Sequence, residues 1–228
     1  MNPPAIRFAL FAGVCTAGML LQSATVRADV VAYTISDTTG SASAATYTLG
    51  FSFMPTANIV VTSLGIFDSS QNGLAASHDI GVWNSGGTLL VSGTVQSGTV
   101  DPLTNQFRYV TVTSTTLLAN QTYTIGAFYL TGSDPVVVKA NGFLTNDISF
   151  INNESAFGGS LTFPTVTNDP SLILLGFPST FNPGIFGPNF QFSPAAVPEP
   201  ASLTLLGLTA VAAGFYRWRC RKASRQAA

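Results

Sequence analysis

The feature that most limits the possible folds is the short-range pattern of residues 29–196. Apolar and polar residues alternate over short stretches, and Gly, Pro, Asn, Asp and Ser separate these stretches. No part of this region keeps a 3.6-residue apolar period for three turns. A period of two is typical of strands with one buried face, whereas an amphipathic helix needs the longer period. We therefore expect an all-β body.

Nine stretches have the composition of strands, and two later ones carry a weaker pattern. The nine are 30–36, 46–53, 59–67, 80–83, 88–95, 107–112, 122–129, 135–139 and 143–151, and the weaker two are 161–166 and 172–175. Residues 84–87, Asn-Ser-Gly-Gly, predict a hairpin turn because Gly tolerates positive φ. Short strands at this spacing favour an antiparallel two-sheet sandwich that is jelly-roll-like.

The core and the boundaries of this body can also be predicted. Residues 46–53 alternate so that Tyr47, Leu49, Phe51 and Phe53 share one face, which we expect to point inward. Beyond about residue 152, turn formers and aromatics predict loops with one or two last strands. We place the body at 29–192 and a flexible linker at 193–200. The body contains no cysteine, so it has neither a disulfide nor a thiolate zinc site.

The charge content excludes several classes of protein. Charged residues make up 8% of the chain, against roughly 25% in ordinary soluble proteins. The body carries nine acidic and two basic residues, a net charge of −7. A nucleic-acid partner is therefore excluded, because binding the phosphate backbone requires a basic surface.

The first 28 residues have the organisation of a signal peptide. Arg7 precedes an uncharged apolar stretch at 8–21, and Val26-Arg27-Ala28 places small or aliphatic residues where signal peptidase cuts. We expect a signal helix, the Sec translocon and signal peptidase as partners, and cleavage after Ala28. The alternatives are a buried first helix and lipidation at Cys15.

The C-terminus has three consecutive parts. Val-Pro-Glu-Pro at 197–200 is forced extended by its prolines, and 17 uncharged residues follow from Pro200 to Tyr216. As a helix these reach about 25 Å, close to the bilayer thickness of about 30 Å. We expect a single transmembrane helix at 201–218 and a basic cytoplasmic tail at 219–228. Four basic residues form the stop-transfer cluster: Arg217, Arg219, Arg221 and Lys222.

This end of the chain resembles a PEP-CTERM sorting signal over residues 197–222. Pro198, Glu199 and Pro200 match the motif as substrate residues. The resemblance implies a Gram-negative bacterium that makes exopolysaccharide, and an exosortase that removes the tail near the motif. The protein would be anchored transiently in the inner membrane, with its body outside the cytoplasm, and would then reach the cell surface or the extracellular space. The alternative is an ordinary C-terminal anchor with a rigid linker.

The central part resembles a β-sandwich module of unknown function that occurs in exported PEP-CTERM proteins. The similarity covers about 45–140, and the family supplies no activity. The matching segments are 61–68 (Val-Thr-Ser-Leu-Gly-Ile-Phe-Asp), 73–74, 77–83 (Ser-His-Asp-Ile-Gly-Val-Trp), 87–90, 107–109 and 123–126.

One loop carries the spacing of a calcium site. Asp68, Ser70, Asn72 and Asp79 fall at positions 1, 3, 5 and 12 of an EF-hand-type loop, and Gly73 is at position 6. Calcium is the one cofactor that the sequence raises. The alternative is a solvated turn between strands, because the same residue types favour turns.

Other candidate sites are weaker. His78 is the only histidine and has no cysteine or Gly-x-Ser-x-Gly nucleophile to assist. A glycosidase would need a pair of carboxylates. The acidic residues here are scattered singly, often before Pro, as is typical of turn residues. Four aromatic residues could stack on sugar rings or fill the core: Trp83, Tyr109, Tyr129 and Phe143.

We expect a non-enzymatic, exosortase-processed protein of the cell surface or extracellular matrix, such as a biofilm matrix. Its role would be structural or adhesive, with exopolysaccharide as a partner. The alternatives are a calcium-stabilised carbohydrate-binding module and a secreted hydrolase.

Overall fold

The computed structural model describes residues 28–35, 41–43, 46–137, 142–166 and 187–195, together with Gly207 and Val211. Several predicted features lie outside these residues: the strand at 172–175, the sorting motif, the basic cluster and nearly all of both terminal helices. Within the described part of the chain, no helix has the length and apolar character to span a membrane.

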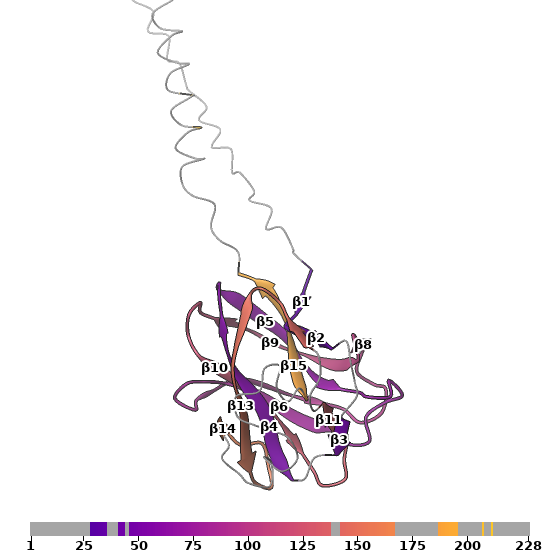
Figure 1. Cartoon of the computed structure of the whole chain (residues 1–228). Helices are drawn as coiled ribbons and strands as arrows, with labels where there is room; N and C mark the ends of the chain where they lie inside the picture. The colour runs from indigo at the N-terminus through magenta and orange to yellow at the C-terminus, as the bar shows by residue number, and fades with distance from the viewer. Residues whose placement is uncertain are drawn as a thin grey trace, which may run out of the picture.

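Two antiparallel sheets make up the body, and the all-β prediction is confirmed (Figure 1). One sheet has the order β1 (Val30–Val31), β15 (Pro188–Pro194), β5 (Ile59–Phe67), β9 (Phe107–Leu117) and β8 (Leu103–Thr104). The other has the order β14 (Thr165–Val166), β13 (Ile148–Phe157), β4 (Tyr47–Pro55), β10 (Tyr123–Tyr129), β6 (His78–Asn84) and β7 (Leu89–Val95). Two small ladders pair β11 (Pro135–Val137) with β3 (Ser41–Ser43) and β12 (Gly142–Leu144) with β2 (Tyr33–Ile35).

The order of the strands gives a jelly roll. The five-stranded sheet contains the run β1-β15-β5-β9, and the six-stranded sheet contains the run β4-β10-β6-β7. Counted along the chain, the first of these eight strands pairs with the last, the second with the seventh, the third with the sixth and the fourth with the fifth, and these pairs belong alternately to the two sheets. This nesting of hairpins is the jelly-roll arrangement. β13 extends the six-stranded sheet beyond β4.

The core lies between the sheets, and the predicted inward face of β4 is confirmed. Tyr47, Leu49, Phe51 and Phe53 are all buried. The ring of Phe53 packs 4.9 Å from that of Phe190, which joins β4 to β15 of the opposite sheet. These apolar contacts stabilise a body that has no disulfide.

The outer face of the six-stranded sheet is also covered. Gly50, Gly126 and Gly81 lie side by side in neighbouring strands, so the sheet has a row without side chains. Residues 158–164, which we call the covering loop, fold back over this row. A Cβ added to Gly126 would lie 3.0 Å from Pro164, and Phe163 packs 6.0 Å from Trp83. The glycines therefore allow the loop to approach the sheet backbone.

Several boundaries differ from the prediction. The stretch 143–151 is two strands, β12 and β13, separated by a turn in which Ile148 donates to the carbonyl of Thr145. β13 continues to Phe157, where loops were expected. β15 reaches Pro194, so the linker predicted from residue 193 is wrong at its first two residues. The hairpin at 84–87 is confirmed, with Gly87 at a φ of 78°.

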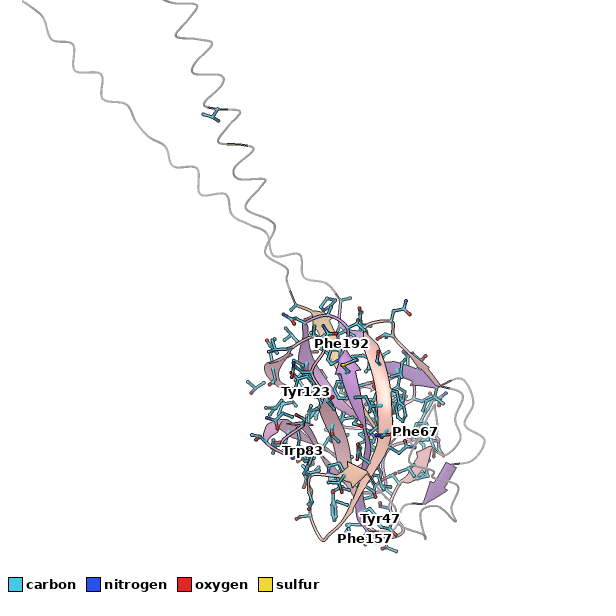
Figure 2. The ribbon with its side chains drawn as sticks, turned by 60° about the vertical axis from the view of Figure 1, so that its left-hand side comes forward. Tyr47, Phe67, Trp83, Tyr123, Phe157 and Phe192 are labelled. Carbon is cyan, nitrogen blue, oxygen red and sulfur yellow. The ribbon has the colours of Figure 1, made fainter. Side chains whose placement is uncertain are left out.

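Both ends of the body leave from one pole. Val30 of β1 pairs with Phe192 of β15, and the amide of Ala195 donates to the carbonyl of Asn58 at 2.9 Å. Ala28, the predicted cleavage position, is exposed two residues before β1. Figure 2 shows Phe192 at this pole and Tyr47 and Phe157 at the opposite one.

Candidate functional site

The Asp68 loop is closed by an arginine from another strand. The carboxylate of Asp68, at the end of β5, accepts hydrogen bonds from Arg108 Nε at 2.8 Å and from the Gly73 amide at 2.9 Å. Both charged side chains are almost fully buried. Arg108 also donates to the carbonyl of Asp101. Gly73 has a φ of 112°, so the sharp turn expected there is present.

The four predicted calcium ligands lie in different environments. Ser70 and Asn72 are exposed in the loop. Asp79 is an exposed residue of β6 in the other sheet, and its carboxylate accepts a hydrogen bond from Thr94 Oγ1 at 2.6 Å. Arg108 already balances the charge of Asp68, so a calcium ion would have to compete with this guanidinium. The calcium site stays a prediction.

His78 forms a second buried pair, with Asp134. Its Nε2 lies 2.9 Å from Asp134 Oδ2, and its Nδ1 lies 2.9 Å from the carbonyl oxygen of Phe128. The amides of Ala75 and Ala76 also donate to the Asp134 carboxylate. Burial raises the pKa of Asp134, but the hydrogen bonds from His78 and these two amides outweigh it and hold the pKa below its usual value.

The contacts of His78 occupy both of its ring nitrogens. The Phe128 carbonyl can only accept, so Nδ1 donates to it. Nε2 faces the carboxylate of Asp134. This arrangement favours a structural role for His78.

Three of the four candidate sugar-stacking residues are buried, Tyr109 and Tyr129 in the core and Trp83 under the covering loop. Trp83, Tyr109 and Tyr129 are each at most 4% exposed, so their rings do not present a face to solvent. The side chain of Phe143 lies outside those that the structure describes. Phe157, which the sequence did not single out, is 64% exposed and packs 4.5 Å from the ring of Tyr47.

Glu154 is a buried acid on the outer face of the six-stranded sheet. It pairs with Gly50 in β4, so it lies at one end of the glycine row. Its Oε2 is buried and accepts no hydrogen bond from the described residues. Burial raises the pKa of Glu154 to about 6, against a smaller lowering from the hydroxyl of Ser52.

The partners of these sites are distant in the sequence. Asp68 and Arg108 are 40 positions apart, and His78 and Asp134 are 56 apart. The Asp-Pro pair at 134–135 predicts a turn and does not indicate the contact of Asp134 with His78. Arg108 could have been found by a charge argument, since it is one of only two basic residues in the body.

The body is a jelly roll whose two ends leave from one pole, and Pro-Glu-Pro begins three residues after Ala195. This combination defines a class of exported protein with a C-terminal sorting signal. Residues 196–222 match the PEP-CTERM protein-sorting motif, and this motif marks the chain as an exosortase substrate that passes through the membrane before processing. Residues 34–168 match the family described as a domain of unknown function, DUF4082, and the chain belongs to this family. Comparison with curated proteins and with solved structures gives no match.

The family region ends before the jelly roll is complete. It stops at residue 168, whereas β15 is an inner strand of the five-stranded sheet, between β1 and β5. The folded unit of this protein therefore reaches Ala195, directly before the matched sorting motif and three residues before Pro198.

Proposed function

We propose that the body is a non-enzymatic structural and adhesive component of the extracellular matrix, released there after processing. The observation that carries this proposal is the use of its ionisable groups for packing. Asp68 is held in a buried ion pair with Arg108, both ring nitrogens of His78 are engaged by Asp134 and the Phe128 carbonyl, and Asp101 accepts a hydrogen bond from the Gln96 amide. Groups bound in this way stabilise a fold and have little freedom for acid–base chemistry.

The geometry of the ends supports the proposed route. The signal peptide leads the chain into the Sec translocon, and signal peptidase cuts after Ala28. The predicted helix at 201–218 would then hold the chain, and the basic cluster would keep its end in the cytoplasm. Ala195 is three residues from Pro198, a span of about 10 Å when extended. The exosortase therefore acts close to the pole from which both ends leave.

Contact with exopolysaccharide is proposed at the opposite pole. Among the described residues Phe157 has the most exposed aromatic ring, and the buried ring of Tyr47 packs against it. Figure 2 shows both at the end away from Phe192. A supported ring with one free face offers apolar area at a small cost in conformational entropy.

The first experiment tests processing and destination. Intact-mass analysis of the native protein should give a C-terminus near 198–200 and an N-terminus at Asp29, and fractionation should place the body in the matrix. A variant with alanine at Pro198, Glu199 and Pro200 should stay in the membrane fraction with its tail. An intact tail through Ala228 in the wild type would contradict the proposal.

The second experiment tests the contact surface. Phe157→Ala should reduce retention of the protein by isolated exopolysaccharide several-fold without changing its melting temperature. Leu118→Ala is the matched control, because Leu118 is 54% exposed at another site. Equal retention of both variants would remove Phe157 as the contact and leave the processing result unaffected.

A further inference from the structure

The four outer strands of the two sheets differ in length. β1, β8 and β14 each contain two residues, whereas β7 contains seven. A short outer strand offers few unpaired backbone groups to another chain, and natural proteins use this device to prevent edge-to-edge association. β7 is therefore the one outer strand of the two described sheets that is long enough to pair with another strand.

β7 also lacks the usual protective residues. Its sequence, Leu-Leu-Val-Ser-Gly-Thr-Val, contains no charge and no proline. Leu89 and Leu90 are 46% and 37% exposed. Its ladder with β6 shifts register beside Leu90, near the hairpin, and is regular from Val91 to Val95. The facing carboxylate, Asp79, is held by Thr94.

An open groove lies beside β7. It measures about 290 Å³ and is lined by residues of β7 and β9: Leu89, Leu90, Val91, Ser92, Thr113 and Thr115. β9 shifts register opposite Val61–Ser63, so it bends near Thr113. The lining is uncharged, which suits a neutral extended segment and gives a charged partner nothing to bind.

We propose that β7 pairs antiparallel with β7 of a second copy, which joins the two six-stranded sheets into one continuous sheet. A two-fold contact of this kind places the same strand on both sides, so each copy supplies the other with the neutral, apolar segment that the groove accepts. The body has a net charge of −7, and β7 is a surface where two copies can meet without repulsion. This inference goes beyond the proposed function, which does not require self-association.

The first test measures mass in solution. The full chain, purified in detergent, should be a dimer by light scattering, and Leu90→Lys with Ser92→Lys should make it a monomer with an unchanged melting temperature. Thr104→Lys, on exposed β8, is the matched control and should remain a dimer. A wild-type monomer at about 100 μM, or a dimer that persists in the double variant, overturns the proposal.

A second test does not depend on how well the charged variant folds. With Cys15→Ser and Cys220→Ser the chain has no thiol, so Ser92→Cys supplies one reporter. Mild oxidation should give a cross-linked dimer for Ser92→Cys and leave Thr104→Cys monomeric. Equal cross-linking of the two overturns the proposal. Since neither test concerns processing or exopolysaccharide, the proposed function can survive a negative result.

Discussion

The two sheets take their strands from different parts of the chain. Every strand of the six-stranded sheet lies between residues 47 and 166, inside the family region. The five-stranded sheet takes β1 and β15 from opposite ends of the body and places β15 near its centre. The difference shows that one sheet is complete within the recognised family region, while the other depends on seven residues beside the sorting signal.

The largest expected effect comes from removing β15. A chain that ends at residue 187 loses the buried rings of Phe190 and Phe192 and the pairing partner of both β1 and β5. Losing two fully buried aromatic side chains costs about 6–10 kcal/mol, which is comparable to the whole stability of a domain. We expect no cooperative thermal transition by circular dichroism.

The matched control ends at Ala195 and should melt like the full chain. If the chain ending at 187 melts at the same temperature as this control, β15 is not essential and the contrast between the sheets is lost.

The same contrast explains what the sequence could predict of the fold. The six-stranded sheet was largely recognised because its strands alternate clearly, as 46–53 does, and are bounded by turn residues. Local pattern does not place β15, because Pro188 and Pro194 are its first and last residues and it follows a run of turn formers. Proline marks an edge or the end of a strand, so local pattern does not show that β15 lies between two other strands of a sheet.

The candidate sites were predicted only in part, for a related reason. The turn at Gly73 follows from local spacing, and the structure has it. Whether Asp68 meets a calcium ion or a guanidinium depends on Arg108, which the fold brings from another strand. Periodicity contains no information about such a contact, because the two residues meet only after the sheets have formed.

The second prediction tests the ion pair of the five-stranded sheet. Arg108→Met should lower the free energy of unfolding by about 3–5 kcal/mol, because it leaves the buried carboxylate of Asp68 without its cation. Chemical denaturation measures the loss. Adding Asp68→Asn to this variant should restore part of it, and a double variant less stable than Arg108→Met would contradict the pairing.

The third prediction concerns Glu154 in the six-stranded sheet. Its pKa in the folded protein is about 6, above the ordinary 4.5, so the folded state holds the proton more tightly than the unfolded state. The stability from this proton is fully present below about pH 4.5 and is lost as pH rises through about 6, by about 2 kcal/mol over the whole range. Glu154→Gln should remove this loss and be more stable than the wild type at pH 7.5. Denaturation curves at pH 4.5 and 7.5 give the comparison, and parallel curves for the two proteins would contradict it.

The fourth prediction concerns the glycine row under the covering loop. In Gly126→Ala the new Cβ would lie 2.9 Å from Thr48 and 3.0 Å from Pro164, so the loop must shift outward. We expect a loss of about 1 kcal/mol. In a Trp218→Phe background Trp83 is the only tryptophan, so quenching of its fluorescence reports the loop directly. Gly159→Ala is the control, because a Cβ there meets nothing within 4 Å.

The smallest effect is expected from calcium, and it bears on whether the two sheets are linked. A calcium ion bound by Asp68 and Asp79 would connect the five-stranded sheet to the six-stranded one. Because Arg108 and Gly73 already donate to Asp68 and Thr94 donates to Asp79, we expect the same melting temperature in chelator and in 10 mM calcium. A site with a dissociation constant of about 1 mM would instead add about 1.4 kcal/mol at that concentration. A rise in melting temperature that Asp79→Asn abolishes would contradict this expectation and would show that Asp79 binds the ion.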